Sequence, residues 1–217
     1  MLIPEAARVL VPKTPALDAY DRRKGMSFSA IKPEASDSIS RLGEPDRSDL
    51  PADILELYKA NHEENWIRSL AVNPDTARRF SSYFASLFTS SRQARLSLAE
   101  RELIAVVVST ENGCGLCSIH HTIALGEQID DHARTRRIAL DHHLSPLSPR
   151  EEALAAFALK VTKAPKSISS ADFQSLKSVG LDDADILEAL ETNSWFNHTN
   201  RIFISLGVTP DDKYFAR

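Results

Sequence analysis

The chain lacks a long apolar run, lacks a block of basic residues and has only two cysteines. No apolar stretch approaches the ~18 to 20 residues that a membrane-spanning helix requires, which excludes a membrane protein. Charged residues make up 26% of the chain and the formal net charge is only −4, so nothing indicates a nucleic-acid partner. Pro4 and Glu5 stand where a signal peptide has basic and then apolar residues. A cytoplasmic protein is therefore expected, acting on a small molecule or another protein.

Two further absences bear on which cofactors and metals the protein could use. The sequence has no GxGxxG motif, so we expect no flavin or nicotinamide cofactor. It has one CxxC and no second CxxC or spaced histidine pair that would complete four zinc ligands, so a zinc site at the cysteines is disfavoured. Two cysteines in a single CxxC are typical of a reducing compartment, where such a pair is catalytic rather than a structural crosslink.

The chain divides into an irregular N-terminal arm and one helical domain. Residues 1–50 hold five of the eleven prolines and show no sustained periodicity, so we predict an irregular arm over 1–38. Residues 39–217 show helical spacing throughout and need no strand, which predicts an all-α bundle of about eight helices. Its core motif region is 98–126.

A helix is predicted from Leu98 to Asn112. Ser97 and Glu100 form a capping-box pattern ahead of the apolar run. The β-branched run Leu103 to Val108 would also suit a buried strand, but fifteen residues without Gly or Pro exceed the length of most strands. Gly113 then predicts a tight break, because glycine tolerates positive φ.

The second helix is expected to run from Cys114 to Gly126. Cys114 and Cys117 are three residues apart and His121 is four further on, so the three side chains share one helix face. A helix N-terminus stabilises a thiolate and lowers the pKa of such cysteines from ~8.5 to roughly 3.5 to 7.5. His121 could remove the Cys117 proton, directly or through one water. Helix position favours a thiolate at Cys114, whereas proximity to His121 favours Cys117.

The preceding helix contributes Glu102. If the two helices form an antiparallel hairpin, Glu102 and His121 lie at similar distances from the turn, and the carboxylate would orient the imidazole and raise its basicity. Alone, Glu102 would be a solvated acid near the helix start. His120 points to another face and is expected to be structural or exposed, and the surface is expected for four others: His62, His132, His142 and His143.

The spacing of Glu102, Cys114, Cys117 and His121 resembles that of the alkylhydroperoxidase D group, in the peroxidase-related branch of the carboxymuconolactone decarboxylase-like superfamily. The resemblance covers about residues 39–213 and includes the FNHTNR segment from Phe196 to Arg201. It implies that Cys117 attacks a peroxide, that Cys114 resolves the intermediate, and that His121 with Glu102 relays the proton. Some members have a histidine between the cysteines where this chain has Leu116.

The resemblance implies a thiol peroxidase that reduces a small hydroperoxide and is regenerated by an external dithiol protein. It also implies a homo-oligomer, which an apolar C-terminal helix favours. The alternatives are a cysteine-independent decarboxylase-like enzyme at the same pocket, general disulfide exchange, and a non-catalytic oligomer whose cysteines sense oxidant.

Three other segments give structural expectations. The residues Phe80, Tyr83, Phe84, Leu87 and Phe88 recur at helical spacing and predict a core face or the wall of a pocket over the cysteines. The pattern of Ser148, Pro149 and Glu151 repeats that of residues 97–100 and hints at an internal repeat. In the last helix, aromatic residues are core or interface candidates, and Asn197, Asn200 and Arg201 are expected to bond backbone or a buried acid.

Overall fold

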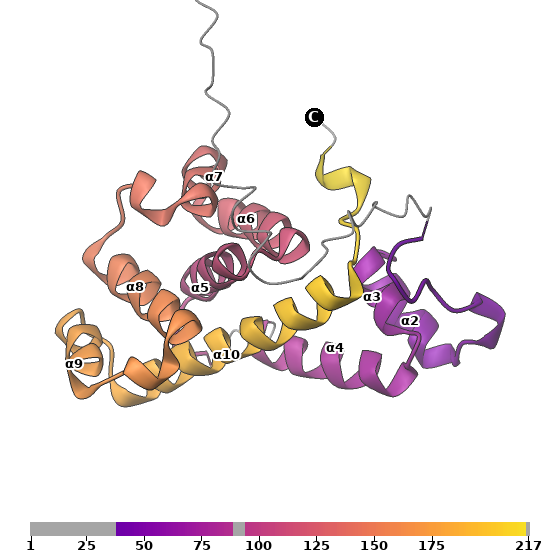
Figure 1. Ribbon diagram of the computed structural model, residues 1–217, viewed down its shortest axis with the longest axis horizontal. Coiled ribbons are helices and arrows are strands. Elements are labelled where there is room, and N and C mark those ends of the chain that lie inside the picture. Colours follow the sequence, from indigo (N-terminus) through magenta and orange to yellow (C-terminus); the bar gives the residue numbers. More distant parts are fainter. Residues whose placement is uncertain (1–37, 89–93, 216–217) are drawn as a thin grey trace, which may run out of the picture. The chain divides into compact units, whose positions relative to one another are not determined.

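The computed structural model describes residues 38–88 and 94–215, and every regular element there is helical (Figure 1). The α-helices are α2 (Ala52–Ala60), α3 (Asn65–Leu70), α4 (Pro74–Phe88), α5 (Leu98–Asn112), α6 (Gly115–Ile129), α7 (His132–Leu140), α8 (Pro149–Lys163), α9 (Ser170–Ser178) and α10 (Asp183–Leu206), with short 3-10 turns η1 (Arg47–Asp49), η2 (His142–Leu144), η3 (Pro165–Ser167) and η4 (Asp212–Tyr214). The all-α prediction is confirmed, with nine α-helices in the described residues rather than about eight. The predicted arm lies outside these residues, apart from Ser38. None of the described helices could cross a membrane.

Both predicted capping boxes are present. The Ser97 hydroxyl accepts a hydrogen bond from the Glu100 N–H, and the Glu100 carboxylate accepts one from the Ser97 N–H. Ser148 and Glu151 make the same reciprocal pair at the start of α8. Both helices run for fifteen residues and pack against each other. The two segments that repeat in sequence therefore start and extend in the same way.

Helix α5 is the central element of the bundle. It packs against α6, α8 and α10, and these helices surround it in Figure 1. Every residue from Arg101 to Ser109 is buried. A helix enclosed on all sides needs no polar face, which explains why periodicity could not distinguish this run from a strand.

The aromatic face of α4 packs onto α10. Phe80 and Phe88 are buried, and the Phe80 ring lies 4.7 Å from the Trp195 ring, centroid to centroid. Phe84 is half-buried and Tyr83 is 40% exposed. The face is thus mostly core, as predicted, with Tyr83 at its edge. Trp195 is itself buried, together with Phe196 and Phe203 on the same helix.

Helix α6 differs from its predicted limits at both ends. Cys114 is the N-cap residue rather than the first helical residue, and the helix continues three residues beyond Gly126 to Ile129. Asp130 supplies the left-handed C-cap that Gly126 was predicted to supply, with φ of 51°. A Cβ on Gly126 would lie 2.2 Å from Nδ1 of His132. Gly126 therefore allows a close approach by α7 and does not end the helix.

Candidate functional site

The α5–α6 hairpin brings Glu102 and His121 together. Gly113 turns the chain with φ of 71°, in the left-handed region that suits glycine. Nδ1 of His121 then lies 2.6 Å from Oε2 of Glu102, and the two side chains are only 13% and 7% exposed. An ionised carboxylate can only accept, so Nδ1 carries the proton and Nε2 is left to exchange one. The Phe196 ring, 4.5 Å from the imidazole between centroids, helps to fix its orientation.

The two cysteines form a buried pair of thiols at the start of α6. Cys114 is 2% exposed and Cys117 is 4% exposed, and neither forms a disulfide. A hydrogen bond from the Cys117 thiol lowers the pKa of Cys114 to about 7, against the opposing effect of burial. The same hydrogen bond, with burial, raises the pKa of Cys117. The pair therefore loses its first proton near neutral pH and holds the second firmly.

Asn200 of α10 adds a third group beside the sulfurs. Its side chain is fully buried, and its amide favours the ionised form of both cysteines. The amide nitrogen donates to the Ser109 hydroxyl at 3.1 Å, and its oxygen accepts from Asn112 at 3.0 Å. The expectation that Asn200 bonds backbone or a buried acid is therefore wrong. Asn200 is 86 positions after Cys114 in the sequence, so no local pattern linked them.

Asn197 and Arg201 follow the expectation more closely. Asn197 donates to the Asn193 backbone oxygen at 3.1 Å, and Arg201 donates to the Asn197 backbone oxygen at 2.6 Å. Both groups stabilise α10 locally.

His121 does not hydrogen-bond to either sulfur within the described residues. Its electrostatic effect falls on Cys114, where it helps to lower the pKa. The predicted chain of contacts from Glu102 to His121 to Cys117 is thus present in its first half only. Catalytic hydrogen bonds commonly shorten only when substrate binds.

A cavity of about 410 Å³ lies beside this group of residues. Cys117, His121 and Glu102 border it, whereas Cys114 does not. Its other walls are largely aromatic and apolar: Trp66, Phe80, Phe84, Leu116, Ile123, Trp195, Phe196 and Phe203. The side chain between the two cysteines, Leu116, therefore contributes an apolar surface to the cavity.

A second polar group borders the same cavity and was not predicted. Glu64 accepts hydrogen bonds from the Trp66 indole at 2.9 Å, from Lys213 and from the Tyr214 hydroxyl. These bonds from Lys213 and Tyr214 outweigh the effect of burial and hold the pKa of Glu64 below its usual value. These contacts connect the start of α3 with η4, and Glu64 and Tyr214 lie 150 positions apart in the sequence.

His120 belongs to this second group, and of the two places expected for it, structural or exposed, it has the structural one. Its Nδ1 lies 3.7 Å from Oε2 of Glu64, and its ring packs on Tyr214. Burial lowers the pKa of His120 to about 4, so the ring is neutral at neutral pH. The side chain is only 17% exposed and borders the cavity. It is therefore neither exposed nor remote from the site.

Comparison with known proteins gives one family match. The model of the carboxymuconolactone decarboxylase family matches residues 74–143, which include Glu102, Cys114, Cys117 and His121. No curated protein matches the chain.

Solved structures match almost the whole domain. The alkylhydroperoxidase AhpD core of an uncharacterized peroxidase-related protein from Ralstonia eutropha JMP134 is 29% identical, with a TM-score of 0.78, covering 83% of this chain and 96% of that one. An uncharacterized peroxidase-related protein from Silicibacter sp. TM1040 is 27% identical, with a TM-score of 0.78, covering 84% and 98%. The debrominase Bmp8 is 17% identical, with a TM-score of 0.67, covering 83% and 95%, and shows only that the fold is shared. The family match over residues 74–143 and the two peroxidase-related structures together support the AhpD-like carboxymuconolactone decarboxylase superfamily as the family of this chain.

Proposed function

We propose that the protein is a thiol-dependent peroxidase of the alkylhydroperoxidase type. One observation carries the proposal: Cys117 borders the same cavity as the buried Glu102–His121 pair. A nucleophilic sulfur, a proton-transfer group and space for a small molecule are thereby combined. The peroxidase-related structures with the same fold support the assignment.

The first step forms a sulfur–oxygen bond. A thiolate attacks the outer oxygen of the hydroperoxide, the O–O bond breaks, and the alkoxide leaves with a proton from His121. The products are a cysteine sulfenic acid and an alcohol. Glu102 stabilises the protonated imidazole that supplies this proton.

The second step closes a disulfide. The sulfur of the other cysteine attacks the sulfenic sulfur and loses its thiol proton, while the sulfenic hydroxyl takes up a proton and leaves as water. Oxidation of the two thiols to a disulfide supplies both electrons that the hydroperoxide accepts. An external dithiol protein then reduces the disulfide by thiol–disulfide exchange, because the chain has no motif for a flavin or nicotinamide.

The roles of the two sulfurs follow from access and charge together. Cys117 borders the cavity, whereas the negative charge of the pair is more stable on Cys114. A proton moving along their hydrogen bond from Cys117 to Cys114 places the thiolate at the cavity. We therefore assign the attack to Cys117 and the resolving step to Cys114.

The test is peroxide oxidation of the purified protein followed by stopped-flow fluorescence and mass spectrometry. Wild type should take up one equivalent of peroxide and form an intramolecular Cys114–Cys117 disulfide. Cys114→Ser should be oxidised once, to a sulfenic acid on Cys117. Cys117→Ser should react slowly, since Cys114 does not border the cavity. Rapid oxidation of Cys117→Ser, with an inert Cys114→Ser, would reverse the two roles.

Turnover distinguishes the enzyme from its alternatives. With a dithiol donor, a peroxidase consumes many equivalents of hydroperoxide, whereas an oxidant sensor stops after one. His121→Ala and Glu102→Gln should slow the reaction by ~10²-fold, the lower range for loss of a positioned proton-transfer group. A cysteine-independent reaction would survive in Cys117→Ser.

A further inference from the structure

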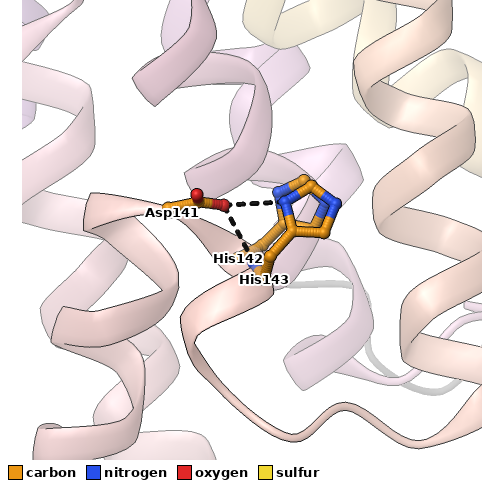
Figure 2. Close-up of side chains that lie close together, drawn as sticks. All are labelled: Asp141, His142 and His143. Carbon is orange, nitrogen blue, oxygen red and sulfur yellow. Dashed lines mark hydrogen bonds and ion pairs between the residues drawn. The ribbon is translucent and has the colours of Figure 1, made fainter.

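A second cluster of metal-ligating side chains lies outside the cysteine cavity, at the end of α7. Asp141, His142 and His143 are consecutive, and each offers a ligand atom within 4.8 Å of the others. Figure 2 shows the two imidazoles side by side, with the carboxylate of Asp141 directed at His143. The ring centroids are 3.9 Å apart. A surface position was expected for His142 and His143, because neither has a partner at helical spacing, and three neighbours in a turn carry no periodic signal.

Asp141 holds the His143 ring in one orientation. Its Oδ1 accepts a hydrogen bond from the His143 backbone N–H at 3.0 Å and lies 2.8 Å from Nδ1 of the ring (Figure 2). These two bonds keep the pKa of Asp141 below its usual value, so the carboxylate is the acceptor. Nε2 of His143 is left free. A metal-binding histidine typically donates its other ring N–H to a carboxylate in this way.

His142 is half-buried, and its ring lies against that of His143. The carboxylates of Asp141 and Glu152 both act on the His142 ring and supply negative charge for a cation. His143 is 72% exposed, and the ligand atoms of the three residues lie within 4.8 Å of one another, close to the ~4.2 Å that two nitrogens span across a zinc ion at the usual Zn–N distance.

A hollow of about 350 Å³ beside the cluster offers further oxygen groups. Glu111 and Thr110 of α5 line it together with the three residues of the cluster. The Thr110 hydroxyl oxygen is buried and has no hydrogen-bond partner in the described part of the chain. This hydroxyl is therefore available to bond a water molecule in the hollow.

We propose that this cluster binds one divalent transition-metal ion of the Zn²⁺, Ni²⁺ or Cu²⁺ type. His142 and His143 are the protein ligands, Asp141 is the residue that positions His143, and water completes the coordination. Imidazole ligands select these ions over Mg²⁺ and Ca²⁺, which prefer oxygen ligands. The site shares no residue with the cavity at Cys117, so it is independent of the proposed peroxidase.

Calorimetric titration of untagged full-length protein with Zn²⁺ tests the site. The Cys114→Ser/Cys117→Ser background removes the competing thiols. One equivalent should bind, and His142→Ala/His143→Ala should weaken binding at least 100-fold. Asp141→Ala should weaken it about 10- to 100-fold, as loss of a positioning carboxylate does. The exposed His198→Ala is the matched control and should bind like the background.

Three outcomes would overturn the proposal. They are the absence of binding up to ~1 mM Zn²⁺, unchanged binding in His142→Ala/His143→Ala, and loss of binding in His120→Ala instead. The last would place the ion at Glu64, His120 and Asp211, which also lie within 4.8 Å of one another. Circular dichroism of the double variant should show unchanged helix content, and the single His143→Ala should lose affinity if the pair acts together.

Copper supplies a readout of the ligands themselves. Electron paramagnetic resonance of one equivalent of Cu²⁺ should show coupling to two imidazole nitrogens in the cysteine-free background and to one in His143→Ala. A spectrum with oxygen ligands alone would contradict the assignment.

Discussion

At the scale of single residues, the two cysteines differ in how readily they ionise and in whether they border the cavity. The sulfur with the lower pKa, Cys114, is not the sulfur that borders the cavity. A hydrogen bond between two thiols resolves this, because the proton that remains after the first ionisation can lie on either sulfur. The helix N-terminus and His121 therefore act on the pair as a unit rather than on separate cysteines.

A pH dependence follows from this shared ionisation. The pKa of Cys114 is lowered to about 7, so the thiolate is scarce below pH 7 and predominates above it. The rate of oxidation by peroxide should rise with pH through about 7 and then level off. Stopped-flow oxidation between pH 5 and 9 measures the profile. A rate that continues to rise tenfold per pH unit beyond pH 8 would mean that the cysteines ionise independently at their usual pKa.

Asn200 should contribute to the lowered pKa of this cysteine pair. Its amide favours the thiolate form of both cysteines, so Asn200→Ala should raise the pKa of the pair and move the pH profile upward. A hydrogen bond to a charged group contributes ~1.5 to 3 kcal/mol, so we expect the oxidation rate at pH 7 to fall about tenfold. The maximal rate at high pH should change less.

The matched control is Asn197→Ala, one turn earlier on α10. Its amide nitrogen donates to Thr162 at 3.1 Å and to Asn193, and neither cysteine responds to it. The control should keep the wild-type pH profile even if α10 loses stability. A profile that shifts equally in both variants would indicate a general loss of packing instead.

At the scale of secondary-structure elements, the α5–α6 hairpin creates the site. Gly113 adopts φ of 71°, where a side chain is strained, although a Cβ would contact nothing within 4 Å. Gly113→Ala should therefore lower the free energy of unfolding by about 1 to 2 kcal/mol through backbone strain alone. Gly113→Asn should cost less, because asparagine tolerates the left-handed region. Urea unfolding followed by circular dichroism measures both.

Gly115 provides the same chemical change two residues away. It lies in the first turn of α6, without a positive φ, and a Cβ there would also contact nothing within 4 Å. Gly115→Ala should be neutral or stabilise the protein by about 0.4 to 1 kcal/mol, because alanine has less freedom to lose on folding. Equal destabilisation by both substitutions would show that a side chain, and not the sign of φ, disturbs the hairpin.

Local signals in the sequence were sufficient to predict most helix limits. Reciprocal caps at Ser97 and Ser148 and the turn at Gly113 depend only on neighbouring residues, and the structure places them as predicted. Gly126 misled the prediction because a contact with α7, and not its own backbone, requires a glycine. A residue whose role depends on a distant element carries no local sign of it.

The candidate site also combines residues that local signals predict with residues that only distant contacts bring together. Spacing placed Glu102 opposite His121 because one hairpin relates the two residues, and they lie 19 positions apart. The Glu64–Tyr214 contact spans 150 positions and the Asn200–Ser109 contact spans 91. Such contacts depend on how α3, α5 and α10 pack, which periodicity does not specify.

At the scale of the whole molecule, the apolar surface outside the core bears on assembly. The C-terminal helix was expected to provide an apolar interface, but Trp195, Phe196 and Phe203 are buried in the core of their own chain. In the described residues, the most exposed large apolar side chain is Leu140, at 77%, and Leu144 is 58% exposed in the same segment. Leu140 is the last residue of α7, and Leu144 is the last residue of η2, which follows it.

We expect a homo-oligomer in which a second copy covers Leu140 and Leu144. Burial of apolar surface contributes about 25 cal/mol per Å², and closed homo-oligomers are the commonest assemblies of soluble proteins. Sedimentation equilibrium at ~10 µM, with a chelator present to exclude metal-linked association, should give a multiple of 24.0 kDa.

Leu140→Glu/Leu144→Glu should shift the protein to a monomer, because it would place two charges in the contact. The control, Leu187→Glu, changes a side chain that is 67% exposed on α10 and should leave the mass unchanged. Dissociation by the control alone would move the interface to α10, and a wild-type mass of one chain would rule out the oligomer.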